Sequence, residues 1–236
     1  MRILLIIYFA LAAAIPLTGV GASDERYEHR AQSRDGIGKV YMDREISHVM
    51  GHLGAGWLER PEREREERTD TLIELLPLQP DYVVADIGAG TGYFSFPVAQ
   101  RVPDGKVLAV DIQQEMLDII ESRKTETGIH NVETVRGQID DPGLQPSSVD
   151  LIFMVDAYHE FSHPWEMGSA MAQALKPGGQ LVLVEYRAED RRVPIKRLHK
   201  MSEEQARKEM AAIGLEWLRT DDDLPQQHVL VFRKAL

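Results

Sequence analysis

Short apolar runs alternate along much of the chain with longer stretches in which charged and apolar residues mix. Four runs, at 83–87, 106–111, 131–135 and 149–156, have the length and composition of strands in a parallel sheet. The stretches between them are long enough for the crossover helices that parallel strands need. This alternation predicts an α/β domain in which helices cover both faces of a mostly parallel sheet.

Further elements are expected on both sides of these four strands. Prolines before and after 63–76 indicate the first full helix. Residues 175–185 are interpreted as a helix end, a Pro-Gly-Gly turn and a fifth strand. A serine-led capping box opens a helix over 202–213, which a glycine ends. Runs at 215–219 and 228–233 then bring the expected sheet to seven strands.

Residues 1–22 have the organisation of an export signal. A basic residue follows Met1, an apolar stretch covers 3–20, and small residues precede Ser23. We expect cleavage after Ala22 and an exported, periplasmic protein. The alternative is an uncleaved anchor that associates the protein with the membrane through its N-terminus, because about 17 apolar residues can just span a bilayer.

Three segments follow the signal. Residues 23–39 are polar and are expected to be flexible, 40–76 are expected to be mainly helical, and 77–236 should form the α/β domain. The part from 41 to 57 is rich in Gly, His and Met and ends in a Trp, which is unusual for a surface helix. It is expected either to cover the ligand site as a lid or to pack as a plain helix and loop on the sheet edge.

A glycine-rich turn follows the strand at 83–87. Gly88, Gly90 and Gly92 let the backbone turn sharply and approach a ligand, because they have no Cβ atom. The turn opens a helix, whose free N–H groups favour a polar or anionic group. Asp86 lies at the end of the apolar strand, where a carboxylate is costly without a partner. The ligand or the loop is expected to supply that partner.

The next strand also ends in an acid. Asp111 follows Gly90 by 21 residues, a spacing that fits one helix and one strand and puts the carboxylate beside the glycine turn. A carboxylate there can accept both hydroxyls of a ribose, so the two features together predict a nucleoside ligand. Asp111 is also placed to cap a helix over 113–124, and the two roles are compatible.

Composition excludes several classes of protein. The formal net charge is −11, whereas a general nucleic-acid binder needs a basic face. The sequence has no cysteine, which rules out disulfides, thiolate metal sites and cysteine nucleophiles. Its eight histidines show no tight H-E-x-x-H spacing, and no metal site is expected. The expected partner is a small-molecule substrate, with no nucleic acid.

These motifs together resemble the class I S-adenosylmethionine (SAM) methyltransferase family. The glycine turn has the acidic-x-G-x-G-x-G pattern of that family, and L-K-P-G-G at 175–179 is one of its specific turns. The resemblance covers roughly residues 81–187 and is closest to the small-molecule branch that includes quinone-ring methyltransferases. The run V-M-G-x-x-G-A-x-W-L-E-R at 49–60 is similar to one found in a group of exported or membrane-associated methyltransferase-domain proteins.

The resemblance implies a single domain with a Rossmann-like, seven-stranded sheet, SAM as cofactor, and methyl transfer to an O, N or C nucleophile. Asp86 and the glycine turn would hold the methionine end, Asp111 the ribose, and Ile139 or Asp140 the adenine. The acid that often follows the loop glycine in the family is replaced here by Gln138. The expected cofactor-binding residues are Asp86, Gly88, Ala89, Gly90, Gly92, Asp111, Ile112, Ile139, Asp140 and Asp156.

The strand at 149–156 leads into two candidate catalytic residues. His159 and Glu160 follow the strand end that faces the methyl group in this fold, so either is a candidate base for a substrate hydroxyl or amine. The alternative is that His159 caps the next helix or contacts the ligand without taking a proton. The basic segment 187–200 is expected either to bind an anionic substrate or lipid headgroup, or to form a solvated loop.

Two other functions stay open. SAM is made in the cytosol while the chain carries an export signal, so the second hypothesis is a non-catalytic nucleoside-binding or interaction protein on a methyltransferase fold. The third is an NAD-dependent oxidoreductase. Tyr93 disfavours it, because this residue stands where the dinucleotide motif has its third glycine. The Pro-Gly-Gly turn disfavours it as well.

Overall fold

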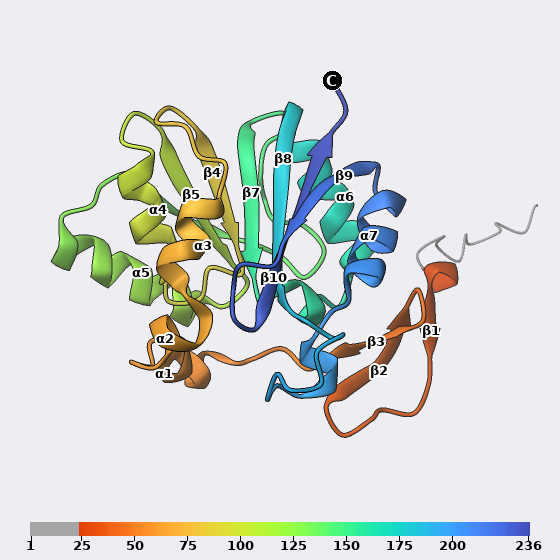
Figure 1. The fold of residues 1–236 in the computed structure, drawn as a ribbon. Helices are drawn as coiled ribbons and strands as arrows, with labels where there is room; N and C mark the ends of the chain where they lie inside the picture. Colours follow the sequence, from red (N-terminus) through yellow and green to blue (C-terminus); the bar gives the residue numbers. More distant parts are fainter. Residues whose placement is uncertain (1–23) are drawn as a thin grey trace, which may run out of the picture.

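The computed structural model describes residues 24–236, so the expected export signal lies outside the described residues. Seven strands form the main sheet: β4 (Val83–Ile87), β5 (Lys106–Asp111), β6 (Val132–Arg136), β7 (Val149–Val155), β8 (Leu175–Tyr186), β9 (Leu215–Asp221) and β10 (Gln227–Lys234). Their order across the sheet is β6-β5-β4-β7-β8-β10-β9 (Figure 1). Neighbours from β6 to β8 are parallel, whereas β10 runs antiparallel to both β8 and β9. The fold class expected from the sequence is confirmed.

Helices cover both faces of this sheet (Figure 1). On one face lie α3 (Thr69–Leu75), α4 (Ser95–Arg101) and α5 (Gln114–Thr127), and on the other α6 (Pro164–Ala174) and α7 (Glu203–Ala212). Successive side chains of a strand point to opposite faces of the sheet, which explains why there are two cores. Val84 packs in the first core with Leu117, whereas its neighbour Ala85 packs in the second with Met171. Because both faces are buried, β4 is apolar at nearly every position.

Local signals mark the ends of several helices, and the serine cap predicted at 202 is confirmed. The Ser202 side chain accepts a hydrogen bond from the Gln205 N–H at 3.1 Å and so caps α7. Pro164 occupies the first turn of α6. Gly128 follows α5 in the left-handed conformation, with a φ of 69°.

The segment 23–39, expected to be flexible, instead contains strands of a separate three-stranded sheet. This sheet consists of β1 (Tyr27–His29), β2 (Gly36–Tyr41) and β3 (Arg44–Ser47), all paired antiparallel in chain order. The expectation of a helical region over 40–76 was therefore also wrong for its first eight residues. β3 continues directly into the coil that leads back to the main domain.

Long-range packing explains why these short strands form. Tyr27, Tyr41 and Ile46 make a small core against Trp165 of α6, and the Tyr27 hydroxyl donates to the Glu166 carboxylate. Few residues of the strands are apolar, and their partners lie far along the chain. Their polar composition therefore hid them from a reading of local pattern.

The helix expected over 63–76 is two helices, α2 (Arg63–Glu67) and α3, separated at Arg68. Arg68 has a φ of 53°, and its left-handed conformation ends α2. The Thr69 hydroxyl and the Asp70 N–H then both bond the Glu64 carboxylate. These local bonds compete with a continuous helix, which accounts for the break.

The expected Pro-Gly-Gly turn lies inside β8 as an irregularity. Val149 of β7 pairs with Leu175, and Leu151 pairs next with Gln180. The residues between these partners bulge from the ladder, and Gly178 has a φ of 76° within them. The turn therefore lengthens β8 beyond the strand that the sequence predicted.

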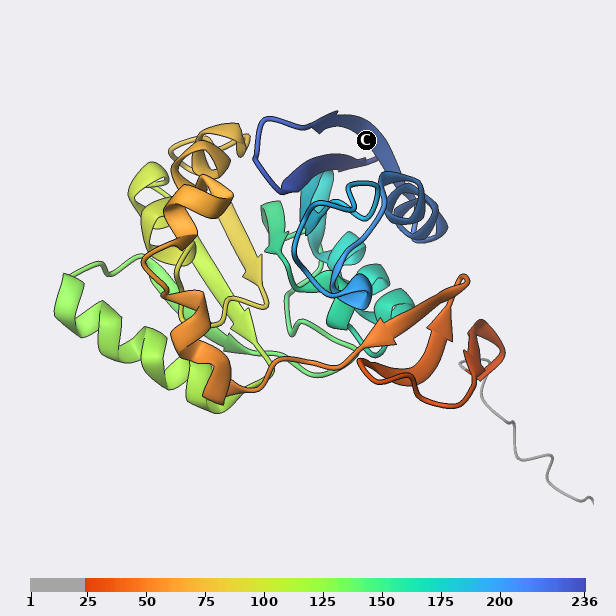
Figure 2. The same cartoon turned by 60° about the horizontal axis from the view of Figure 1, so that its bottom comes forward.

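Residues 48–58 connect the small sheet to α2, and we call them the crossing segment. They contain a 3₁₀ turn at His52–Gly54 and α1 (Ala55–Leu58). The segment passes below the carboxyl ends of the parallel strands (Figure 2). Ligands of open α/β sheets bind at that edge, so this segment covers the expected site. Between residues 24 and 236, no helix has the length and apolar character needed to cross a membrane.

Candidate active site

The glycine turn ties three strands together at their carboxyl ends. The N–H groups of Gly88 and Ala89 both donate to the Val110 carbonyl, at 2.9 and 3.0 Å. Gly88 has a φ of 75°, and a Cβ atom there would lie only 2.8 Å from the Cβ of Ala157, just after β7. Only glycine therefore fits this position without a shift of the backbone.

Asp111 holds the turn from the neighbouring strand. Its Oδ2 accepts from the Gly90 N–H at 2.9 Å, and its Oδ1 accepts from the Gln113 N–H at 2.8 Å. Burial raises the pKa of Asp111, although the two backbone N–H groups oppose this shift. The carboxylate is thus fixed beside Gly90, where the spacing of 21 residues predicted it, and Gln113 rather than Asp111 is the N-cap residue of α5.

Asp86 does not reach the ligand side of the turn. Its Oδ2 accepts from the Ser95 hydroxyl at 2.6 Å, and the side chain is 3% exposed. Burial raises the pKa of Asp86 to about 7, against the hydrogen bond from Ser95, which lowers it. The expected partner of this acid is therefore supplied by the first residue of α4, and contact of Asp86 with the cofactor stays a prediction.

A cavity of about 210 Å³ opens at the carboxyl ends of β4, β5 and β7. The predicted site residues in its wall are Gly88, Gly90, Asp111, Ile112, Ile139, Asp156 and Glu160. Five other predicted residues of the described chain do not line it: Asp86, Ala89, Gly92, Asp140 and His159. Ala89 and Gly92 shape the turn instead, because the Gly92 N–H donates to the Ala89 carbonyl at 2.9 Å.

Asp156 combines backbone strain with an unsatisfied oxygen. Its φ of 51° is left-handed, which is uncommon for a residue with a side chain. Oδ2 accepts from the Gln227 side-chain amide at 2.7 Å, whereas the buried Oδ1 has no hydrogen-bond partner among residues 24–236. Burial, and then the nearby Glu67 and Glu185 carboxylates, raise the pKa of Asp156 well above its ordinary value. A cationic or N–H donor would satisfy this oxygen.

The loop after β6 contributes different residues from those expected. Gly137, Gln138 and Ile139 line the cavity, but Asp140 is exposed and lies outside it. The Gln138 N–H donates to the Asp141 carbonyl at 2.7 Å, which turns the loop back before Asp140 can face inward. The cavity wall therefore contains Gln138 and not Asp140, and the adenine contact of Asp140 stays a prediction.

The crossing segment closes the cavity from the outside. The Met50 N–H donates to Glu160 Oε2 at 3.0 Å, which ties the segment to the end of β7. Gln113 ties it to the start of α5, because its amide accepts from the His52 N–H at 2.7 Å and donates to the Met50 carbonyl at 3.0 Å. A Cβ at Gly90 would lie 2.7 Å from Leu58 Cδ1, so the segment also touches the glycine turn.

Salt bridges fasten the far end of the crossing segment. Glu59, the next residue, accepts from the Thr91 hydroxyl at 2.5 Å and from Arg123 at 2.6 Å. Arg63 is buried, pairs with Glu67 at 2.8 Å and donates to the Leu58 carbonyl at 2.9 Å. The placement agrees with the lid alternative, and the closing motion stays a prediction.

The sequence interpretation missed several residues of the cavity wall. Val49, Met50 and Leu58 come from the crossing segment, and Gln113 and Gln138 follow β5 and β6. The first three fall within the run at 49–60 that was noted as a family feature. That run was the available signal, but its position over the cavity depends on how the small sheet packs.

His159 belongs to a neighbouring polar cluster. Its Nδ1 lies 2.6 Å from Glu185 Oε2, and its Nε2 lies 3.2 Å from His199 Nδ1. Burial lowers the pKa of His159, but the Glu185 carboxylate outweighs burial and the pKa is raised overall. Burial, and then the neighbouring His159, lower the pKa of His199 to about 4. Burial raises the pKa of Glu160, the residue that joins this cluster to the cavity.

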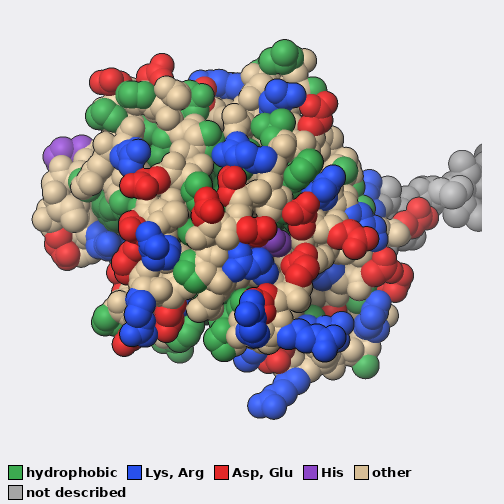
Figure 3. Space-filling model, in the orientation of Figure 1, with side chains coloured by type: hydrophobic (Ala, Val, Ile, Leu, Met, Phe, Trp, Pro, Cys, Tyr) green, Lys and Arg blue, Asp and Glu red, His purple; other side chains and the backbone are tan. Residues whose placement is uncertain are grey.

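Several basic side chains of the segment 187–200 form hydrogen bonds or ion pairs with other groups of the protein. Arg187 donates to the carbonyls of Leu224, Pro225 and Gln227, and Lys200 donates to two carbonyls of its own segment. Arg192 pairs with Asp190. Figure 3 shows positive and negative side chains interspersed over the visible face. These contacts favour the loop alternative over a dedicated anion site.

Comparison with known proteins defines the class. Residues 84–179 match a protein-family model described as "Methyltransferase domain". The Demethylmenaquinone methyltransferase of Listeria monocytogenes serotype 4a is 28% identical over 119 residues, which are 50% of this chain and 50% of that protein. The Ubiquinone/menaquinone biosynthesis C-methyltransferase UbiE of Ectopseudomonas mendocina is 29% identical over 116 residues, 48% of this chain and 45% of that protein. This chain thus matches about half the length of these relatives.

Solved methyltransferase structures have a similar fold. A SAM-dependent methyltransferase from Aquifex aeolicus superposes with a TM-score of 0.74, over 78% of this chain and 99% of that chain, at 22% identity. The fold and the glycine-turn cavity define a class I methyltransferase architecture. Residues 84–179 are similar to a methyltransferase domain, and the chain has the fold of the class I SAM-dependent methyltransferases.

SAM is the cofactor that this class implies, and the residues present fit it. Asp111 lies in the cavity wall, where its carboxylate can accept hydrogen bonds from the ribose hydroxyls. Gly88 and Gly90 leave the backbone open to close approach. The unpartnered Asp156 Oδ1 matches the ammonium group at the methionine end.

Proposed function

We propose that this protein transfers the methyl group of SAM to an O, N or C nucleophile of a small molecule. The observation that carries the proposal is the position of Asp111. Its carboxylate both bonds the Gly90 N–H of the glycine turn and lines the cavity, which joins the two parts of a nucleoside site. Each carboxylate oxygen keeps a second lone pair for a ribose hydroxyl.

The cavity wall suggests how the cofactor is held. Asp111 would accept the ribose hydroxyls, and Ile112 and Ile139 would contact the adenine, with Gln138 beside them. Asp156 would accept from the ammonium of the methionine end, which supplies the missing partner of its Oδ1. Asp86 would act indirectly, by bonding Ser95 and so fixing the turn to α4.

Bound SAM supplies an electrophilic methyl group, whose bond to sulfur breaks as the nucleophile attacks and leaves the electron pair on sulfur. The protein contributes mainly by holding the reacting atoms in line. Glu160 is the group placed to receive the proton of a substrate hydroxyl or amine, because it lines the cavity. His159 is less suited to this role, since its ring nitrogens face Glu185 and His199.

The entrance of the cavity favours an apolar substrate. Val49 and Ile139 line the cavity and are still 54% and 53% exposed. Exposed apolar side chains in the wall of a cavity indicate a binding surface. The names of the two relatives point to substrates of quinone biosynthesis, which agrees with this surface.

We further propose that residues 1–22 direct export, with membrane anchoring as the alternative. The support is the order of basic, apolar and small residues in the sequence. Mass spectrometry of the chain made in a bacterial host should find Ser23 as the first residue. An intact Met1 in the membrane fraction would favour the anchor, which could keep the domain on the side where SAM is made.

Calorimetry of the protein with SAM, its demethylated product and NAD tests the function. SAM and its product should bind, and Asp111→Ala should weaken both by about 1–3 kcal/mol, because a charged acceptor for two hydroxyls is lost. NAD binding, or equal SAM affinity of variant and wild type, would contradict the nucleoside assignment. Tight SAM binding without methyl transfer to any quinol, phenol or amine acceptor would favour the non-catalytic hypothesis.

A further inference from the structure

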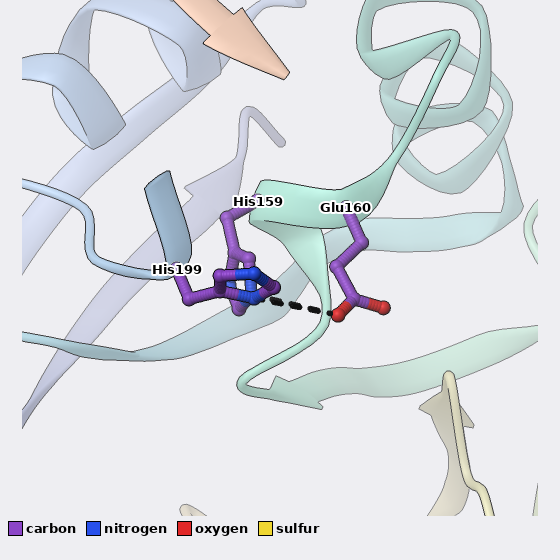
Figure 4. A group of neighbouring side chains, drawn as sticks. All are labelled: His159, Glu160 and His199. Atoms are coloured by element: carbon purple, nitrogen blue, oxygen red, sulfur yellow. Dashed lines mark hydrogen bonds and ion pairs between the residues drawn. The ribbon is translucent and has the colours of Figure 1, made fainter. Parts of the chain in front are cut away.

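Two histidines and a glutamate converge (Figure 4), and the glutamate, Glu160, also lines the cavity. The atoms concerned are His159 Nε2, Glu160 Oε1 and His199 Nδ1, and all lie within 4.8 Å of one another. The first two residues follow β7, and His199 comes from the segment before α7. The methyl-transfer proposal gives no role to His199. This residue lies 40 positions after His159 in the sequence, yet the two side chains are in contact.

We propose that His159, Glu160 and His199 bind a divalent transition-metal ion, with zinc as the best fit. Two imidazoles and one carboxylate are a common ligand set for such ions. Three protein ligands also leave a coordination position open, as in catalytic rather than structural zinc sites. The sequence offered no tight metal motif because the third ligand lies far along the chain.

The spacing of the three atoms suits a tetrahedral ion. Nε2 of His159 lies 3.2 Å from Nδ1 of His199 and 3.8 Å from Oε1 of Glu160, and the remaining separation is 3.6 Å. Ligands about 2.1 Å from a tetrahedral ion lie about 3.4 Å apart, whereas ligands at right angles in an octahedron lie about 3.0 Å apart. The measured separations scatter around the tetrahedral value.

Glu185 supplies the outer contact that metal-binding histidines usually have. Its Oε2 lies 2.6 Å from His159 Nδ1, and its Oε1 accepts from the His159 backbone N–H at 3.2 Å. Glu185 is completely buried on β8, so its carboxylate is rigidly placed. Such a carboxylate fixes the imidazole with the other nitrogen toward the ion and increases its basicity.

The local charge balance also suits a cation. Glu160 and Glu185 bring two carboxylates to the cluster. Arg44 donates to the His159 carbonyl, but its own charge is paired with Glu209 at 2.8 Å. A divalent ion would offset the two carboxylates that surround His159.

The ion would lie at the edge of the proposed reaction site, because Glu160 belongs to both the cluster and the cavity wall. This consequence rests on the proposed function. An acceptor oxygen that completes the coordination would release its proton to bulk water more readily, as water does on zinc. Glu160 would then serve as a ligand rather than as the base.

Zinc titration of the untagged, chelator-treated full chain tests the site, with elemental analysis after dialysis. The wild type should bind one zinc ion per chain. His199→Ala and Glu160→Gln should each weaken binding at least about 100-fold, and Glu185→Gln about 10–100-fold. His130→Ala, which removes an exposed histidine elsewhere, is the matched control and should bind as the wild type does.

His199 is partly exposed, so His199→Ala is expected to fold, and circular dichroism would check this. A wild type that binds no zinc, or a folded His199→Ala that binds it equally well, would show a hydrogen-bonded histidine pair only and overturn the proposal. SAM calorimetry on the metal-free protein separates this failure from failure of the proposed function. The Co²⁺-loaded protein should show the intense visible absorption of a four-coordinate ion.

Discussion

The two sides of the cleft satisfy their polar groups in different ways. On the β4–β5 side the acids bond groups that are near in sequence: Asp111 accepts from Gly90 and Gln113, 21 and two positions away, and Asp86 accepts from Ser95, nine positions away. On the β7–β8 side the partners are remote: Asp156 meets Gln227 and Glu160 meets Met50, 71 and 110 positions away.

The β4–β5 side is therefore formed mainly by local contacts, whereas the β7–β8 side forms only when distant segments pack together. One βαβ unit already contains what is needed to place Asp111 against the glycine turn, so binding of the nucleoside part of the cofactor should tolerate changes elsewhere. The β7–β8 side exists only when the crossing segment, β8 and the segment before α7 are all docked. Chemistry is therefore expected to be more sensitive to distant changes than cofactor affinity is.

Glu160→Gln should give the largest effect and separate methyl transfer from cofactor binding. Methyl transfer should fall about 10²–10⁴-fold, because the group that receives the proton or holds the ion is lost. SAM affinity should stay within about threefold, because Asp111 and the glycine turn are untouched. Steady-state kinetics and calorimetry measure the two quantities, and Glu74→Gln on the surface of α3 is the control. Equal losses of rate and affinity would show that the two sides are not separate.

Asp86→Asn should change the free energy of unfolding in a pH-dependent way. The pKa of Asp86 is about 7 in the folded protein and 3.8 when unfolded, so its protonated form stabilises the fold below pH 3.8. This contribution is lost as the pH rises through 7, by on the order of 4 kcal/mol at about 1.4 kcal/mol per unit. Asn keeps a partner for Ser95 without ionising.

Urea unfolding at pH 4, 6 and 8 measures this effect. The stability of Asp86→Asn relative to the wild type should rise across the series, whereas Asp104→Asn on the surface should show no such trend. A constant difference between Asp86→Asn and the wild type would mean that the buried carboxylate is ionised throughout. The local hydrogen bond from Ser95 would then be stronger than the cost of burial.

Asp156→Asn should weaken SAM binding by about 1.5–3 kcal/mol, because a charge-assisted bond to the ammonium group is lost. Binding of adenosine alone should change little, since it lacks that group. Asp150→Asn, at the opposite end of β7 and paired with Lys176, is the control. If adenosine and SAM lose the same affinity, Asp156 supports the turn rather than the methionine end.

Gln113→Ala should give the smallest effect, confined to the crossing segment. It removes the side-chain bonds to Met50 and His52, worth about 1–2 kcal/mol together. Amide exchange over residues 48–58 should accelerate roughly 5–30-fold, and SAM should slow it if the segment is a lid. Gln114→Ala, whose amide bonds Asp118 on its own helix, should leave exchange unchanged. Unchanged exchange in Gln113→Ala would mean that other contacts hold the segment.

The outcome of the sequence interpretation follows the same division. The strands, the seven-stranded sheet and the placement of Asp111 were predictable, because strand alternation and the spacing after Gly90 are local properties. Ile139 and Asp140 were both chosen from the loop after β6, but only Ile139 lines the cavity, because the bond from the Gln138 N–H to Asp141 turns Asp140 outward. A single backbone bond of this kind has no signature in residue type.

Local features of the sequence specified the α/β fold and the Asp111 side of the cleft, because apolar period, glycine positions and helix caps act within about thirty residues. Contacts between distant segments depended on tertiary packing. This packing folded residues 27–47 into a sheet, laid the crossing segment over the cavity, and brought Glu185 and His199 to His159. The physical reason is that a polar group takes whatever partner packing brings to it, and that choice is made only when the cores close.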